Sequence, residues 1–155
     1  MKNNAINQHQ DIIIQYMYIG LLPFFIGAFG PWIFADYEYI LTQILIHYSA
    51  IILSFLAGAL WAVALFTDGN EHKERHIHAA IAFSLIPLLG HLLGYFLPTA
   101  VTLGLSILGF LILLFWEKLF LKELYPSWYQ ELRRRITFIA VACHMLAIWN
   151  VIHTV

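Results

Sequence analysis

Charged residues are scarce in this sequence. Asp, Glu, Lys and Arg together make up 11% of the 155 residues, whereas hydrophobic residues make up 61%. Soluble domains carry about 25% charged residues, so the composition argues against a soluble domain. The formal net charge is −1, and no overall positive field points to nucleic acid as a partner. The scarcity of charge predicts a protein whose main partner is the lipid bilayer.

Cysteine and targeting features are also nearly absent. The single cysteine, Cys143, lies in an apolar run, which excludes a disulfide framework and is typical of a small packing residue. Residues 1–11 form a polar tail that lacks the run of positive charge and the small-residue cleavage site of a secretory signal. We therefore expect the first apolar segment to be retained as a membrane span.

Four long stretches contain no Asp, Glu, Lys or Arg, and a helix of about 20 mainly apolar residues can cross a membrane. The third stretch is too long for one span. Pro98 divides it, because proline disfavours helix at the preceding residue and suits the first turn of a new helix. The sequence predicts an all-α bundle of about five transmembrane helices in a single domain, residues 12–155. The expected spans are about 12–34, 40–66, 77–96, 99–120 and 136–153.

The basic residues are sorted relative to these spans. All eight Lys and Arg residues fall on the side of the N-terminus and none on the other side. Positive charge collects on the inner side of membrane proteins, so the N-terminus is predicted inside and the C-terminus outside. The expected location is the bacterial inner (plasma) membrane, or the mitochondrial inner membrane in a eukaryote.

An aromatic and basic segment precedes the last span. Its interfacial anchor residues are Trp128, Tyr129, Arg133, Arg134 and Arg135. The aromatic rings suit the membrane interface, and the three arginines are expected to face lipid headgroups or water. Ser127 and Gln130 predict a capping box at the start of this helix. A membrane anchor is the simplest interpretation, and a site for anionic lipid or a partner is the alternative.

Small residues recur at every fourth position in two of the predicted spans. They are Ala50, Ser54, Gly58 and Ala62 in the second span and Gly90 and Gly94 in the third. Lipid tails are as apolar as leucine, so spans associate through close packing, which small residues permit. We expect the stripe on the second span to be a buried, central packing face, with Gly109 lying off it. Pro23 and Gly27 predict a kink or a close approach in the first span.

Catalytic groups are missing from the interior of the spans. Acidic and basic residues occur only at their inner ends, whereas proton-coupled transporters usually need such a group within the membrane. No phosphate-binding glycine loop precedes a helix. The sequence therefore predicts a protein that is not an enzyme, and no cofactor is predicted.

Histidine supplies the candidate ligands within the bilayer, namely His47, His91, His144 and His153. His47 and His91 are placed at similar depth on consecutive spans, where two imidazoles can bind haem axially or hold a metal. In the simpler alternative, hydroxyl groups and backbone carbonyls satisfy each ring locally. Haem therefore stays an alternative rather than the prediction.

Three short segments, taken together, are similar to a known family. They are Tyr18-Ile19-Gly20-Leu21-Leu22-Pro23-Phe24, the run Ile52-Leu53-Ser54-Phe55-Leu56-Ala57-Gly58, and Pro126-Ser127-Trp128-Tyr129 followed by Leu132-Arg133 and Ile136-Thr137. Their order and spacing resemble the transmembrane protein 69 family, a membrane domain found in bacteria and mitochondria. The chain departs from the family pattern where Ala57 and Ala62 replace glycine. The resemblance implies a small polytopic inner-membrane protein and supplies no activity.

Three functions stay open at this point. The first is a packing or assembly partner of a larger membrane complex, favoured by the small-residue faces and the lack of catalytic groups. The second is a haem- or quinone-handling protein that uses His47, His91 and Trp61. The third is a small transporter, against which the absence of intramembrane acids and bases weighs.

Overall fold

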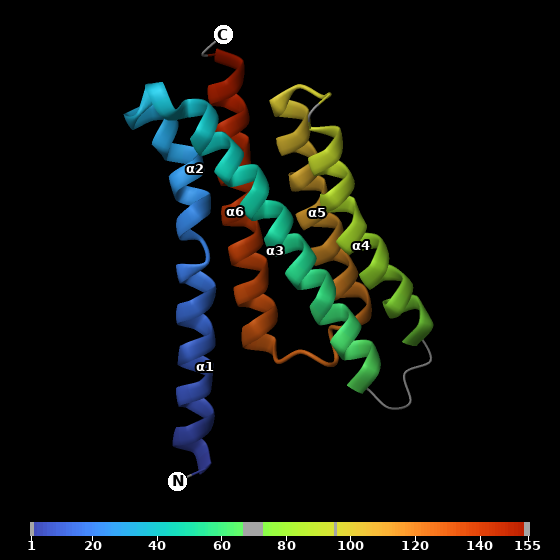
Figure 1. The fold of residues 1–155 in the computed structure, drawn as a ribbon. Coiled ribbons are helices and arrows are strands. Elements are labelled where there is room, and N and C mark those ends of the chain that lie inside the picture. Colours follow the sequence, from blue (N-terminus) through green and yellow to red (C-terminus); the bar gives the residue numbers. More distant parts are fainter. Residues whose placement is uncertain (1, 67–72, 95, 154–155) are drawn as a thin grey trace.

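The structure is a computed structural model that describes the backbone of residues 2–66, 73–94 and 96–153, and their side chains except those of residues 2–8, 73 and 91. Helices make up almost all of this part of the chain, which contains no strand (Figure 1). The elements are α1 (Lys2–Ile19), α2 (Leu22–Ile33), the 3-10 turn η1 (Ala35–Tyr37), α3 (Glu38–Phe66), α4 (Lys73–Leu93), α5 (Thr99–Phe120) and α6 (Ser127–His153). The predicted all-α fold class is confirmed.

The helices form an up-and-down bundle. Helices α1 and α2 follow one another along one line, and each later helix reverses direction, so that the two termini lie at opposite ends (Figure 1). Four helical stretches of the described residues are long and apolar enough to cross a membrane: His9–Ile33, Ala35–Phe66, Thr99–Phe120 and Ser127–His153. The 21 residues of α4 cover about 31 Å, close to the thickness of the hydrocarbon core, and pack along α3. We therefore treat α4 as the fifth span.

The first span is broken between α1 and α2. Pro23 stands in the first turn of α2 and has no N–H group, so it cannot continue the hydrogen-bond ladder of α1. The hydroxyl group of Tyr48 on α3 donates a hydrogen bond of 2.9 Å to the carbonyl oxygen of Gly20 in the break. The kink that Pro23 predicts is confirmed, and a side chain from a neighbouring helix compensates for it.

Gly27 allows α2 to lie directly against α3. A Cβ atom built at Gly27 would be 2.6 Å from the Cβ of Leu45 and 3.2 Å from the carbonyl oxygen of Leu41. Both atoms belong to or adjoin the backbone of α3, so no side-chain rotation relieves the contact. The close approach predicted at Gly27 is confirmed.

The buried face of α3 is not the predicted stripe of small residues. Ser54, Gly58 and Ala62 are exposed, and no atom lies within 4 Å of a Cβ built at Gly58. The prediction that they form a central packing face is therefore wrong within this chain. The core side of α3 carries Leu45, Ser49, Leu53, Ala57, Leu60 and Ala64, where leucines alternate with small residues. Such alternation lets neighbouring helices interlock without leaving voids.

The remaining small residues divide between inner and outer positions. Ala50 and Gly90 line one narrow gap between α3, α4 and α5, and a Cβ built at Gly90 would meet no atom within 4 Å. Gly94 is half-buried just after α4. Gly109, expected to lie off the packing face, is buried on α5, where a Cβ would lie 3.0 Å from Cδ1 of Leu53. The periodicity of the small residues did not indicate which side of a helix faces the core.

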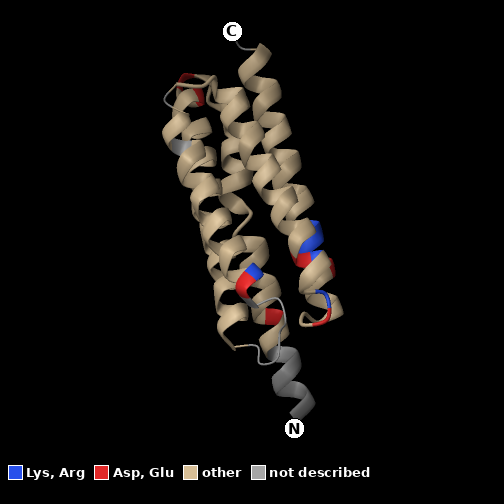
Figure 2. Ribbon diagram, turned by 90° about the vertical axis from the view of Figure 1, so that its right-hand side faces the viewer, with Lys and Arg blue, Asp and Glu red and all other residues tan. Residues whose placement is uncertain are grey.

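The basic residues gather toward one end of the bundle, whereas acidic residues lie at both ends (Figure 2). Every Lys and Arg residue that the ribbon of Figure 2 colours lies toward the end where the chain begins, here called the basic end. Asp36 and Glu38 lie at the opposite, acidic end, between α2 and α3. The sorting of charge that the sequence predicts is thus present in three dimensions.

This sorting predicts a testable orientation. A reporter fused after Val155 should behave as external, and one inserted near Asn70, between α3 and α4, should behave as internal. Alkaline phosphatase and green fluorescent protein fusions report the two sides. An internal signal after Val155 would mean that the orientation or the number of spans is wrong.

Candidate functional site at the basic end

A buried ion pair connects α5 and α6. Nε of Arg133 lies 3.0 Å from Oε2 of Glu117, and the two side chains are only 5% and 7% exposed. Nη1 of Arg133 also donates a hydrogen bond of 2.8 Å to Oγ1 of Thr137, one turn further along α6. The prediction that Arg133 faces headgroups or water is wrong, because the carboxylate of Glu117 compensates its charge inside the bundle.

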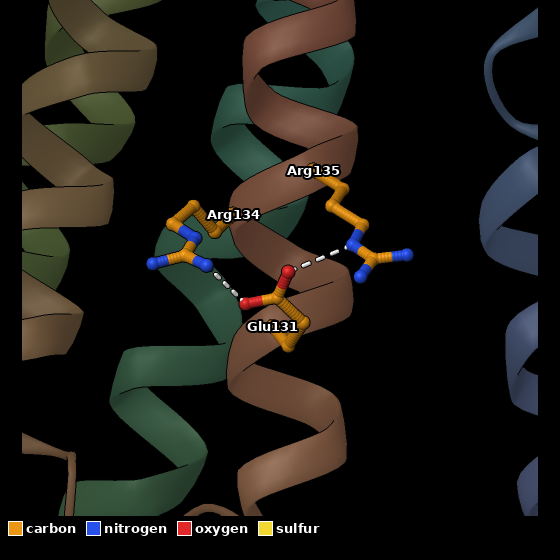
Figure 3. A network of polar contacts seen from close by, with 3 residues as sticks. All are labelled: Glu131, Arg134 and Arg135. Atoms are coloured by element: carbon orange, nitrogen blue, oxygen red, sulfur yellow. Dashed lines mark hydrogen bonds and ion pairs between the residues drawn. The ribbon is translucent and has the colours of Figure 1, made fainter.

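Arg134 and Arg135 do face outward, as predicted. They are 60% and 64% exposed and share the carboxylate of Glu131, with a distance of 2.7 Å from Nε of Arg135 to Oε1. Figure 3 shows the two arginines on opposite sides of Glu131, with Arg135 toward α1 and Arg134 on the side away from α1. Only Arg134 of the two lines the groove between α5 and α6.

This groove has a volume of about 420 Å³. Its polar lining consists of Glu117, Lys118, Tyr125, Ser127, Gln130, Glu131, Arg133 and Arg134, and its apolar lining consists of Leu111, Leu114, Phe115 and Phe138. The sequence alone does not predict the groove, because Glu117 has the pattern of an ordinary charge at the end of a span. The available signal was Glu117 beside Lys118 on one span and Arg133 at the start of the next.

The loop of residues 121–126 joins α5 to α6 and contributes Tyr125 to the groove lining. The side-chain amide of Gln130 donates hydrogen bonds of 2.7 Å to the carbonyl oxygens of Lys122 and Tyr125. The predicted capping box is wrong, because Ser127 is the first residue of α6 and the backbone N–H of Gln130 donates to the carbonyl oxygen of Pro126, the residue before the helix. Burial raises the pKa of the Tyr125 phenol, and the nearby carboxylate of Glu117 adds to the effect, so this side chain is neutral at physiological pH.

His144 lies at the centre of the bundle and is completely buried. Its Nε2 is 2.8 Å from the hydroxyl oxygen of Ser49 on α3, and its Nδ1 is 2.7 Å from the carbonyl oxygen of Ala140. The rings of Phe24 and Phe110 lie 5.7 and 5.8 Å from the imidazole. In the neutral ring, Nδ1–H donates to the carbonyl oxygen of Ala140. The single hydroxyl proton of Ser49 lies within reach of two acceptors, Nε2 of His144 and the carbonyl oxygen of Leu45 at 2.6 Å. The chain itself satisfies both nitrogens, so His144 joins helices rather than presenting a free ligand.

The other predicted ligands lie near the acidic end. His47 is exposed, its Nδ1 is 2.5 Å from the carbonyl oxygen of Gln43, and it lines a cleft of about 310 Å³ with Gly94. His153 is stacked on Trp149, with ring centroids 3.9 Å apart. The side chain of His91 lies outside the described residues, so the His47 and His91 pairing stays a prediction. Among the side chains that are described, no three His, Cys, Asp or Glu residues form a group suited to a metal ion.

The geometry defines a class of protein: a polytopic, all-helical membrane protein with a charged groove at one end and a structural histidine at its centre. The chain belongs to the family described as "Protein of unknown function (DUF3429)", whose model matches residues 11–149. No curated protein and no solved structure matches the chain.

Proposed function

We propose that this membrane protein is a non-enzymatic packing or assembly partner of a larger complex in the bacterial plasma membrane or the mitochondrial inner membrane. The observation that carries the proposal is the outward position of the small-residue stripe on α3. A Cβ built at Gly58 would meet no atom within 4 Å. On the surface of α3, the neighbours of Gly58 three residues away are Phe55 and Trp61, and those four residues away are Ser54 and Ala62.

Such a surface fits a second helix. The side chains of Phe55 and Trp61 are 71% and 41% exposed, and they flank the notch at Gly58. In a membrane, small residues allow the backbone of another helix to approach closely, and flanking aromatic rings enlarge the contact. The resemblance to the transmembrane protein 69 family agrees with the proposed membranes.

The proposal is tested by co-purification from native membranes in a mild detergent. Gly58→Leu fills the notch and should remove the co-purifying proteins while leaving the chain folded. Gly104→Leu is the matched control, because a Cβ at Gly104 also meets nothing within 4 Å but lies on α5. Loss of the same partners in both variants, or in neither, would contradict a role for the α3 stripe.

The same purified protein also tests the alternative function, haem handling. Bound haem absorbs in the visible range and needs axial ligands, for which His47 and His91 are the candidates. We expect a spectrum without such a band. A visible band that disappears in His47→Ala would assign the protein to haem handling and overturn the proposal.

A further inference from the structure

The groove between α5 and α6 changes from charged to apolar along its length. The charged lining lies at the basic end, and Leu111 and Phe138 lie further from that end. With a rise of 1.5 Å per residue, Leu111 is about 9 Å from Glu117 along α5, and Phe138 is about 8 Å from Arg133 along α6. Phe115 and Phe138 are also 61% and 54% exposed to the surroundings of the bundle. This gradient matches that of a phospholipid, which has a polar headgroup and apolar chains.

The charged end of the groove is positive overall. Its lining contains three cations, Lys118, Arg133 and Arg134, against two carboxylates, Glu117 and Glu131. Both carboxylates are already paired with arginines. Lys118 is exposed and makes no ion pair with any side chain that the structure describes. The excess positive charge favours an anionic occupant.

Arg133 supplies a second, independent indication. Its side chain is 95% buried in the groove wall, yet its Nη2 has no hydrogen-bond partner among the described residues. Leaving a buried charged donor without an acceptor costs free energy. A guanidinium group matches the oxygens of a phosphate group in shape and charge.

We propose that the groove binds one anionic phospholipid. Its phosphate group lies between Lys118 and Arg134, above the buried guanidinium group of Arg133, and its acyl chains follow Phe115 and Phe138 toward the centre of the membrane. The start of the 27-residue helix α6, at Ser127 in the groove lining, adds the positive end of a helix dipole. Anionic lipids of the leaflet at the basic end supply the ligand.

The test counts bound lipid on the full-length protein. Protein reconstituted in vesicles of equal parts phosphatidylglycerol and phosphatidylcholine is extracted in mild detergent, and retained lipid is identified by native mass spectrometry. We expect one phosphatidylglycerol per chain. Lys118→Gln and Arg134→Gln should each weaken retention about fivefold, the effect expected of one basic residue near an anionic headgroup.

Arg135→Gln is the matched control. It removes the same charge from the same helix and the same Glu131 partner, but it lies on the side facing α1 (Figure 3). Retention should be unchanged in this variant. Equal loss in Arg134→Gln and Arg135→Gln, equal retention of phosphatidylcholine, or no retained lipid in the unmodified chain would each overturn the proposal. Release of the lipid by millimolar inorganic phosphate would also overturn it, because the ligand would then be a free anion.

Discussion

Glu117→Ala should be among the most destabilising single substitutions in the chain. It leaves the guanidinium group of Arg133 buried without its carboxylate, and breaking a buried ion pair in this way costs about 3–5 kcal/mol of unfolding free energy. Thr137 then remains the one hydrogen-bond partner of Arg133 among the described residues. The measurement is the midpoint of unfolding of the purified protein in mixed detergent micelles.

Two further variants isolate the cause. Glu131→Ala removes a carboxylate from an exposed ion pair and should leave the midpoint of unfolding almost unchanged, because surface ion pairs contribute little to the free energy of unfolding. The double variant Glu117→Leu/Arg133→Met replaces both charges by apolar groups and should recover most of the loss. If Glu117→Ala and Glu131→Ala shift the midpoint equally, the buried pair does not stabilise the bundle.

Gly27→Leu should have the second large effect. Even its Cβ would overlap Leu45, and the neighbouring atoms belong to the backbone side of α3, so α2 and α3 must separate. Overpacking of this kind costs about 1–3 kcal/mol in soluble cores, and lost close packing between membrane helices acts in the same direction. A lower temperature of aggregation in detergent, measured by fluorescence-detected size exclusion, reports the change.

Gly58→Leu is the control for this substitution. It adds the same side chain to a membrane helix, but at a position with open space. The isolated chain should therefore tolerate Gly58→Leu better than Gly27→Leu. The reverse order would mean that α3 packs within the chain through the predicted stripe and not through the face that contains Leu45 and Leu53.

The helices and their order could be predicted because hydropathy and charge sorting depend on local sequence. Pro98 marks the boundary before α5, and Pro23 marks the break before α2. Gly27 is predictable as a point of close approach from local sequence too, because a glycine beside a kink leaves room for a neighbouring helix. These signals need no knowledge of which helices are adjacent.

The site could not be predicted because it depends on pairs of helices. Glu117 and Arg133 each resemble an ordinary interfacial charge, and only the antiparallel packing of α5 on α6 buries them together. His144 meets Ser49, 95 positions earlier in the chain, for a similar reason. The small-residue stripe around Gly58 was wrongly predicted to be buried. Periodicity shows that small residues share one face of the helix, but it does not show whether a helix of the same chain covers that face.

Site-specific photo-cross-linking at residue 55 tests the role of the α3 stripe most directly. Phe55 is replaced by a benzoyl-phenylalanine, which preserves an aromatic ring beside Gly58, and the control places the same group at Trp149 on α6, which is 56% exposed. After irradiation of native membranes, we expect a discrete adduct with another membrane protein at residue 55 and none at residue 149. Adducts with lipid alone at both positions, or an adduct of twice the chain's mass at residue 55, would contradict a role in a larger complex.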